Sequence, residues 1–346
     1  MAENGFPKRR ATDPHPTPQS KGLAKPEWAN MPQELWDTVI RDVREGRGTL
    51  NRALRYRLVS RSWDKMVLHL LKQRKCLVIE LPVRQHVARP RTLSDILVRV
   101  AALCPALTHL QFNCRAANGK TGLTNDAMKT LSTEFPTLEH LNISAVSGDE
   151  YSEDGINHLA NIKGIKTFTM KQYYTFKASC LINIATSWKD TLQRLIIRGC
   201  GPNFVTKEAA TAIAKCTALT EVGLQLCDLE ADPILILLES CRTLTYLDVS
   251  TNEHAFYGKS LIWPRNTSLQ TLDVRNCGIN YEHLLQIQAC YPNLKQLYLK
   301  GRYNRFAVEQ KRNFIESMKE THPDCLVDWE NVSPRLSAHL HDIVYE

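Results

Sequence analysis

One short pattern of apolar residues recurs along most of this chain and limits what the chain can fold into. The pattern is L-x-x-L-x-L-x-x-N/C, with Ile, Val, Met or Phe able to replace Leu. It occurs eight times between residues 107 and 299, with first positions spaced 31, 27, 27, 27, 25, 25 and 25 residues apart. A recurring unit of this length is the signature of a repeat architecture, in which each unit packs only against its neighbours.

Each occurrence predicts a short β-strand followed by a turn. The second and third apolar positions are two residues apart, so they point to the same side of a strand. One unit buries about three apolar side chains, at roughly 1.5–3 kcal/mol each, and only stacked units offset the cost of ordering the chain. The eight pairs are Leu110/Phe112, Leu141/Ile143, Phe168/Met170, Leu195/Ile197, Val222/Leu224, Leu247/Val249, Leu272/Val274 and Leu297/Leu299.

The array extends at both ends, and the segments between its strands carry helix signals. Thr124 and Asn280 stand before apolar residues at helical spacing and are expected as N-caps. Asp232 is expected as an N-cap with Pro233 at the first helical position. The connector 250–268 has no clear helical pattern, and its structure is left open. A weaker strand unit is expected at Cys76/Ile79/Leu81, and a closing strand at Cys325/Val327/Trp329.

About eight of the eleven cysteines fall on repeat positions, and the cysteines form no site of their own. No CxxC pair occurs, and no Cys/His cluster has the spacing of metal ligands, so neither a metal nor a cofactor is expected. Free cysteine behaves as a small buried hydrophobe, which explains its place at repeat positions. Three cysteines follow the strand (Cys200, Cys227, Cys277), and four precede the first apolar position (Cys104, Cys216, Cys241, Cys290).

The segments outside the repeats differ in composition. Residues 1–27 contain five prolines and almost no aliphatic residues, which predicts a disordered tail. Residues 28–75 carry apolar side chains at helical spacing, enough for three short helices. The predicted organisation is therefore a tail over 1–27, a helical domain over 28–75, repeats over 76–330 and a C-terminal tail over 331–346.

Charge and motifs exclude several classes of function. The net charge of +8 is modest and lies mostly before residue 62, as expected for a solvated basic surface rather than a nucleic-acid groove. No apolar run approaches the roughly 18–20 residues that span a bilayer, and no signal peptide is evident. No GxSxG, HExxH, Walker A or GxGxxG motif occurs. We therefore expect a non-catalytic protein of the cytoplasm and/or nucleus, without membrane or nucleic-acid partners.

Two stretches of the helical domain resemble an F-box, a family that typically reads L-P-x-E-[LI] and, further on, R-L-V-C/S-[KR]-x-W. The first is Met31-Pro32-Gln33-Glu34-Leu35-Trp36, continuing to Ile40, and the second is Arg57-Leu58-Val59-Ser60-Arg61-Ser62-Trp63. Met31 departs from the usual leucine, and the stretch 44–51 is more charged and glycine-rich than is usual. The remaining 270 or so residues resemble the cysteine-containing class of leucine-rich repeats, as at Cys104-Pro105-Ala106-Leu107.

The order of F-box and repeats resembles the substrate adaptors of SCF-type cullin–RING ubiquitin ligases. The resemblance implies an α/β fold, a horseshoe of short parallel strands alternating with helices, preceded by a small all-α module of three helices. It implies a protein substrate that the repeats hold for ubiquitination and proteasomal degradation, with no catalytic residue in this chain. It also implies that a Skp-type linker protein, and through it a cullin–RING ligase, docks on Pro32, Leu35, Ile40, Leu58, Val59 and Trp63.

Strand alternation predicts which residues face the substrate, since residues flanking the apolar positions point to the opposite side. Lys171, Arg194 and Arg198 fall on adjacent strands, about 5 Å apart, where basic groups suit a carboxylate or phosphate. Tyr246, Arg275 and Tyr298 are of the types that dominate interfaces. The hypothesis is an acidic or phosphorylated substrate segment. The alternative is that these are ordinary strand residues paired with Glu221, Asp248 or Asp273.

Two further alternatives stay open. In the first alternative, the helices between Leu35 and Leu71 form only a cap that closes the first repeat. In the second, the repeats form a protein-binding scaffold unconnected to ubiquitin, such as an inhibitor, an assembly factor or a GTPase activator.

Overall fold

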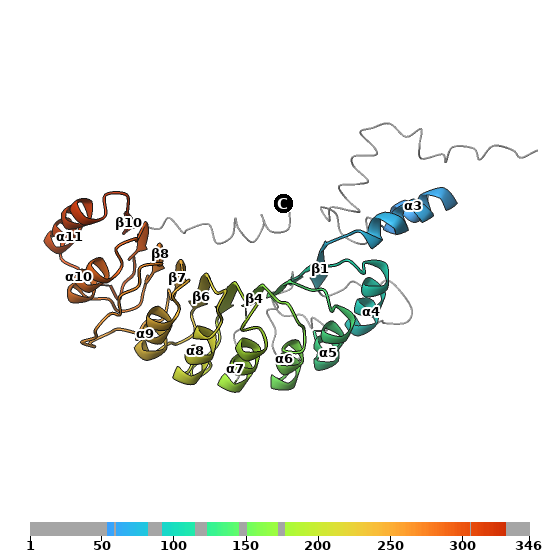
Figure 1. The fold of residues 1–346 in the computed structure, drawn as a ribbon, viewed down its shortest axis with the longest axis horizontal. Helices are drawn as coiled ribbons and strands as arrows, with labels where there is room; N and C mark the ends of the chain where they lie inside the picture. The colour runs from blue at the N-terminus through green and yellow to red at the C-terminus, as the bar shows by residue number, and fades with distance from the viewer. Residues whose placement is uncertain are drawn as a thin grey trace, which may run out of the picture.

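The structure, a computed structural model, describes residues 54–58, 60–81, 92–114, 123–144, 151–171, 177–304 and 306–329. Within these ranges the chain forms an arch with parallel strands along its inner, concave side and helices along its outer, convex side (Figure 1). The two predicted tails lie outside the described residues, as do Pro32, Leu35, Ile40 and Val59; of Leu58 only the backbone is described.

The strands of the described residues form one parallel sheet, in which each strand pairs with its neighbours in chain order. They are β1 (Cys76–Leu81), β2 (His109–Cys114), β3 (His140–Ser144), β4 (Thr167–Lys171), β5 (Arg194–Arg198), β6 (Glu221–Gln225), β7 (Tyr246–Asp248), β8 (Thr271–Asp273), β9 (Gln296–Tyr298) and β10 (Leu326–Asp328).

A short 3-10 helix and α3 precede the sheet, and further helices lie between most of the strands. They are η2 (Tyr56–Leu58), α3 (Arg61–Lys72), α4 (Leu93–Leu103), α5 (Asn125–Glu134), α6 (Glu153–Leu159), α7 (Ala178–Ser187), α8 (Lys207–Ala214), α9 (Ala231–Ser240), α10 (Tyr281–Cys290) and α11 (Val308–Thr321). The α/β repeat fold expected from the sequence is confirmed for this part of the chain.

The paired apolar positions form the core, as predicted. The register places Leu110 beside Leu141, Leu141 beside Phe168, and so along the sheet to Leu297. Leu247 and Leu272, in the middle of the array, have no exposed surface. Six of the seven repeat cysteines named above are buried, and Cys290 is half-buried, which confirms their role as packing residues in the repeats.

A ladder of hydroxyl groups joins successive repeats. The residue just before a first apolar position donates a hydrogen bond to the carbonyl oxygen of the first apolar position one repeat earlier. These bonds run from Thr137 to Leu107 (3.0 Å), Thr191 to Ile165 (2.8 Å), Thr243 to Leu219 (2.7 Å) and Ser268 to Leu244 (2.9 Å). Each bond satisfies a carbonyl at the edge of the sheet and ties one repeat to the next.

Buried asparagines hold the turns that follow the strands. Asn252 accepts hydrogen bonds from the backbone N–H groups of Cys227 (2.9 Å) and Leu229 (3.0 Å). Its amide donates to the carbonyl oxygens of Leu224 (2.8 Å) and Val249 (2.6 Å). A single side chain thus closes its own turn and the turn before it, as the N/C position of the pattern requires.

Two details of the sequence prediction are wrong. In the first repeat the buried pair is Leu77/Ile79, because these residues pair with Leu110 and Phe112. The position of the first leucine is taken by Arg74, whose side chain is fully buried and whose Nε donates to the carbonyl oxygen of Cys76 (2.8 Å). A charged residue at this position hid the correct register.

The second error concerns the start of α9. Glu230, not Asp232, is the N-cap, and it makes no side-chain capping bond. Asp232 lies inside the first turn and instead forms an ion pair with Lys207 of α8. The predicted caps at Thr124 and Asn280 are confirmed, since both side chains accept a backbone hydrogen bond from the first turn of α5 and α10.

The connector between β7 and β8, left open above, contains no helix. Buried aromatic side chains take the place of a helix, with the rings of Phe256 and Trp263 centred 4.9 Å apart. Buried Asn266 donates to the carbonyl oxygens of Leu238 (2.8 Å) and Cys241 (3.1 Å), which ties the connector to the end of α9.

The third predicted helix of the N-terminal domain is confirmed as α3. The side chain of Ser60 caps it by accepting a hydrogen bond from the N–H of Trp63 (3.2 Å). Met66, Val67 and Leu71 are buried as part of the repeat core, and half-buried Trp63 packs against that core. The described part of this domain is therefore continuous with the first repeat.

We expect Leu272→Asp to lower the free energy of unfolding by about 3 kcal/mol or more, because it places an unpaired charge in a fully buried site. Urea unfolding followed by circular dichroism measures the change. Gln193→Asp, at an exposed position before β5, is the matched control and should change stability by no more than about 0.5 kcal/mol. Equal stabilities for the two variants would show that the register is wrong.

Candidate protein-binding surface

Two rows of side chains cross the concave face, because residues on either side of an inward-pointing apolar residue point outward. The first concave row contains Cys76, His109, His140, Thr167, Arg194, Glu221, Tyr246, Thr271, Gln296 and Leu326. The second concave row contains Val78, Gln111, Asn142, Thr169, Ile196, Gly223, Asp248, Asp273, Tyr298 and Asp328. The character of the rows changes along the arch, in three sections.

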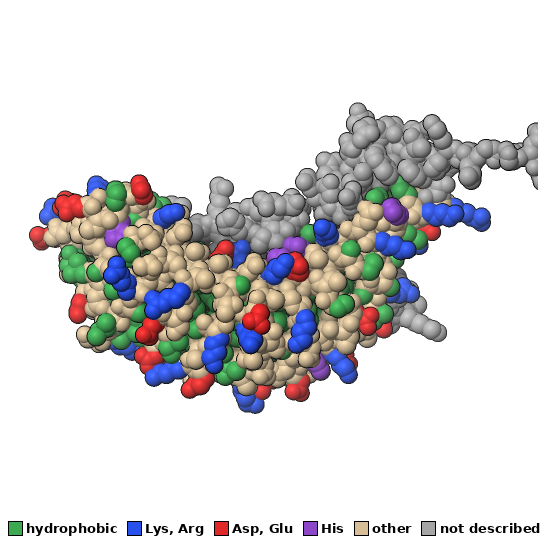
Figure 2. Space-filling view, in the orientation of Figure 1, with side chains coloured by type: hydrophobic (Ala, Val, Ile, Leu, Met, Phe, Trp, Pro, Cys, Tyr) green, Lys and Arg blue, Asp and Glu red, His purple; other side chains and the backbone are tan. Residues whose placement is uncertain are grey.

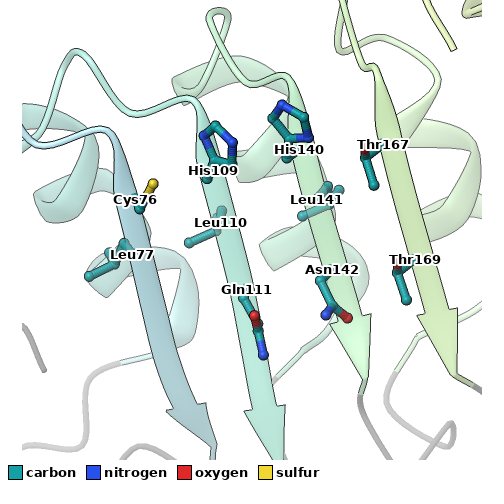
Figure 3. Close-up of a pocket in the computed structure, with 10 residues that line it drawn as sticks. All are labelled: Cys76, Leu77, His109, Leu110, Gln111, His140, Leu141, Asn142, Thr167 and Thr169. Carbon is teal, nitrogen blue, oxygen red and sulfur yellow. The ribbon is translucent and has the colours of Figure 1, made fainter. Parts of the chain in front are cut away.

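The first section, β1 to β4, has no acidic or basic side chains in its two rows. A shallow hollow of about 30 Å³ lies over these strands, between the two rows (Figure 3). His109 and His140 lie side by side along one edge of the hollow, and Gln111 and Asn142 lie along the other edge. The hollow is therefore bordered by hydrogen-bonding groups that carry no formal charge at neutral pH.

The two histidines form a stacked pair. Their ring centroids are 3.9 Å apart, with 14° between the ring planes. Burial, with His140 alongside, lowers the pKa of His109 to about 4. Burial also lowers the pKa of His140, although Glu139 acts in the opposite direction. Both rings are consequently neutral near pH 7, and protonating both would place two charges within stacking distance.

The second section, β5 and β6, is charged. Nε of Arg194 lies 2.9 Å from a carboxylate oxygen of Glu221 on the next strand, and the Arg194 side chain is only 9% exposed. Lys171 is half-buried and pairs in register with Arg198, which is exposed. The structure therefore places Lys171 beside Arg198 at the C-terminal ends of β4 and β5, whereas Arg194, which Glu221 neutralises, lies at the other end of β5.

The third section, β7 to β9, combines buried carboxylates with tyrosines. Asp248 and Asp273 are fully buried neighbours on adjacent strands. The Asp273 carboxylate accepts two bonds from Nε of Arg275, at 2.9 and 3.0 Å, and the Arg275 guanidinium lies 5.6 Å from the ring of Tyr298. Burial and the nearby Asp248 carboxylate raise the pKa of Asp273 to about 7.

Tyr246 belongs to the same section. Its hydroxyl donates to the Asp248 carboxylate (3.3 Å), and burial raises its pKa. Tyr298 is 5% exposed, so little of its ring is open to a partner in this conformation. Arg194 pairs with Glu221, and Arg275 pairs with Asp273, as expected if these are ordinary strand residues that pair among themselves. Lys171 and Arg198 have no such partner among the ion pairs of the described residues.

Residues that the sequence did not single out are prominent on this face. His109 and His140 begin consecutive strands, in His-Leu-Gln-Phe-Asn and His-Leu-Asn-Ile-Ser, so aligning the repeats reveals their shared row. The pairing of Asp248 with Asp273 follows from the same alignment. The burial of Asp248 and Asp273 does not follow from the alignment, since it depends on the tyrosine and arginine side chains packed beside them.

The linker-binding prediction falls mostly outside the described residues, as given above. Within them, the ring of Trp63 lies 6.1 Å from that of Tyr56, and Arg57 forms an ion pair with Asp64 of α3. These two contacts hold η2 against the start of α3. Lys and Arg side chains mix with Asp and Glu over the helical side of the arch (Figure 2), where no single sign of charge dominates.

No group of three or more His, Cys, Asp or Glu side chains in the described residues is arranged to hold a metal ion. None of the described helices is both long enough and apolar enough to cross a membrane.

Comparison with known proteins agrees with the repeat architecture. A family model described as a leucine-rich repeat matches residues 265–282. None of the curated proteins compared with this sequence matches it. The matched segment contains β8 and the start of α10, and the same strand unit recurs along the described part of the chain.

Three solved structures are similar to this chain at 14% identity. The leucine-rich repeat-containing protein LegL7 from Legionella pneumophila has a TM-score of 0.40, with 73% of this chain and 94% of that chain covered. The complex of Rad7 and Elc1 from yeast has a TM-score of 0.31, with 70% and 86% covered. The Toll–Spatzle complex from Drosophila has a TM-score of 0.44, with 78% and 38% covered.

The depressed pKa values of the histidine pair predict a loss of stability in acid. Between pH 6.5 and about 4 the unfolded histidines bind protons that folded His109 does not, so the free energy of unfolding falls as pH falls through this window. Asp273 acts in the opposite sense because its pKa is raised, and a comparison of variants therefore isolates the histidine contribution.

The double variant His109→Gln/His140→Gln should lose less stability than the wild type between pH 7 and pH 5, as measured by urea unfolding. His254→Gln, at an exposed histidine, is the matched control and should behave as wild type. An identical loss in the double variant and the wild type would exclude the pair as the acid-sensitive element.

Proposed function

We propose that this chain is a non-catalytic substrate adaptor of an SCF-type cullin–RING ubiquitin ligase. In this role the F-box-like residues 28–75 dock a Skp-type linker protein, and the concave face of the repeats binds the protein to be ubiquitinated. The observation that carries the proposal is the direct joining of these two parts. α3 ends at Lys72 and β1 begins at Cys76, with the apolar face of α3 buried in the repeat core.

This junction matters because an adaptor must hold its substrate at a fixed position relative to the ligase. A flexible connection between docking domain and binding face would spread the substrate over many positions. Here α3 contains the end of the F-box-like motif and also contributes Val67 and Leu71 to the core of the repeats. A rigid element shared by both parts supports their use as one unit.

The concave face supports protein binding by its construction. Its backbone belongs to a continuous parallel sheet, so the outward side chains of both concave rows are held at regular spacing. The rows carry histidine, arginine, tyrosine and amide side chains, which make directional contacts. Lys171 and Arg198 are the basic residues of this face that we assign to an acidic or phosphorylated substrate segment.

The scaffold without a ubiquitin role is the second candidate, and one observation favours it. Met66, Val67, Leu70 and Leu71 of α3 are buried against the first repeat, as a simple capping helix would require. Linker binding distinguishes the two candidates, since only an adaptor needs it. For both we propose a location in the cytoplasm and/or nucleus, where the free thiols found at ten described cysteines remain reduced.

Docking of the linker is tested with Leu35→Asp in the full chain. A charge in an apolar helix-in-groove contact would be desolvated without a partner, so binding of a purified Skp-type linker should weaken at least 100-fold by calorimetry. Val98→Asp, at a half-exposed valine of α4, is the matched control and should bind as wild type. A wild-type chain that does not bind the linker would favour the scaffold without a ubiquitin role.

Substrate binding is tested with Lys171→Glu/Arg198→Glu, a double charge reversal on the concave face. Capture of ubiquitinated proteins that accumulate with the wild type should fall several-fold, while linker binding and the thermal midpoint stay unchanged. Lys189→Glu/Lys215→Glu makes the same change of charge on the exposed helical side and should leave capture unaltered. Equal capture by both doubles would place the substrate site elsewhere.

A further inference from the structure

A third row of side chains runs along the edge of the concave face where the strands end. It consists of the residue that follows the third apolar position in six successive repeats, and we call it the rim row: Lys171, Arg198, Gln225, Ser250, Arg275 and Lys300. Lys171 pairs in register with Arg198, and Arg198 with Gln225. Backbone hydrogen bonds continue the parallel ladder past the later strands, from Gly199 to Gln225, Leu226 to Ser250, Thr251 to Arg275 and Asn276 to Lys300.

The rim row is basic along its whole length. Four of its six residues are Lys or Arg, and none is acidic. Arg275 is paired with Asp273, whereas Lys171, Arg198 and Lys300 take part in none of the ion pairs of the described residues. Neighbouring strands lie about 4.8 Å apart, so these cations extend over about 24 Å from β4 to β9. A row of basic groups of this length is complementary to an extended acidic chain.

One apolar residue lies against this basic row. Leu226 directly follows Gln225 and is 40% exposed, while no other large apolar residue in the described turns directly after β5 to β9 is exposed. Its neighbours along the edge are the polar or small residues Gly199 and Thr251. The exposed leucine therefore adds an isolated apolar contact to an otherwise polar edge.

The backbone of Leu226 makes a leucine an unfavourable choice at this position. Its φ is 54°, in the left-handed region, and the equivalent residues Gly199, Thr251 and Asn276 have φ values of 77°, 63° and 55°. Every one of these turns requires a left-handed residue, which glycine and asparagine adopt at the lowest cost. Leucine here bears conformational strain and leaves apolar surface in water. Contact with a partner accounts for a side chain that neither the turn nor the core requires.

The spacing between this leucine and the nearest cations restricts the partner. Arg198 and Gln225 are register partners on adjacent strands, so Arg198 and Leu226 are close neighbours along the edge. An extended chain advances about 3.3 Å per residue, so one that crosses the strands reaches Leu226 within about three residues of Arg198. A protein segment supplies both a carboxylate and an apolar side chain at this spacing. A free inorganic anion supplies only the charge.

We propose that the rim row binds an acidic segment of the partner protein, in which one large apolar side chain covers Leu226. A carboxylate within about three residues of that side chain pairs with Arg198 or Lys171. Leu226 thereby distinguishes such a segment from an acidic chain without apolar residues. The inference deepens the proposed function and rests on it for the use of the concave face as the binding surface.

Peptide selection on the full chain tests which residues the rim row recognises. Random peptides displayed on phage are selected against the immobilised protein, and the enriched sequences are synthesised with a fluorescent label. We expect them to share an Asp or Glu within three residues of Leu, Ile, Met, Phe or Trp. Replacing that acidic residue by its amide, or the apolar residue by Ser, should weaken binding at least tenfold by fluorescence anisotropy.

Leu226→Gly is the matched variant on the protein. Glycine adopts the left-handed turn without strain, so the thermal midpoint should not fall below that of the wild type, while the affinity for the selected peptides should fall at least tenfold. Thr251→Gly makes the same backbone change one repeat further on and should alter the affinity less than threefold. If Leu226→Gly does not fold, Leu226→Asn, with the residue type found at position 276, replaces it.

The proposal is overturned if selection yields no binding peptide, if the enriched peptides lack the pairing of acidic and apolar residues, or if they bind Leu226→Gly as tightly as the wild type. Peptides that depend on Lys171 and Arg198 but not on Leu226 remove the apolar contact and leave the acidic-segment site of the proposed function standing. Peptide binding does not require the linker, so a chain that binds no linker still tests the rim row.

Discussion

The in-register stacking of one strand on the next is the constraint on which the structure depends. A strand of three to six residues with two inward apolar side chains cannot bury them alone, and the pair is covered only by the equivalent pairs of its neighbours. The hydroxyl ladder from Thr137 to Ser268 and the buried amide of Asn252 add hydrogen bonds that only this register allows. The burial of apolar side chains and the hydrogen bonding of polar groups thus favour the same strand register.

This constraint also determines where function can reside. The inward apolar positions form the core, and the two concave rows lie on the opposite side of the sheet. Along the arch these rows pass from an uncharged section around the histidine pair, through the Arg194–Glu221 ion pair, to a section of buried carboxylates and tyrosines. A partner that crosses the strands meets three chemical environments in succession, which allows one continuous face to distinguish related sequences.

The sequence was most informative where one interaction dominates, as with the alternating pairs from Leu110/Phe112 to Leu297/Leu299. The sequence pattern gave a wrong prediction where a single residue departs from the repeat and makes a contact of its own. Arg74 stands at the position of the first leucine, and its Nε donates to the carbonyl oxygen of Cys76, two residues further on. Asp232, predicted as the N-cap, instead forms an ion pair with Lys207 of the preceding helix. The ion pair joins residues that become adjacent only after folding.

The candidate site was foreseen less completely than the fold for a similar reason. Alternation identifies Arg194 and Tyr246 as concave residues, but the neutralisation of Arg194 by Glu221 depends on the register between β5 and β6. The stacking of His109 on His140 depends likewise on the register between β2 and β3. Exposure and charge on this face are properties of pairs of strands, whereas a sequence pattern describes one strand at a time.

The central claim, that the concave face is the binding surface, is tested most directly by site-specific photo-cross-linking in cells. Benzoylphenylalanine is placed at Gln225 and Gln296 of the concave face and, in separate chains, at the exposed Thr211 and Glu239 of the helical side. The account predicts protein adducts from the two concave positions and none above background from the helical positions. Adducts that form mainly from Thr211 and Glu239 would contradict it.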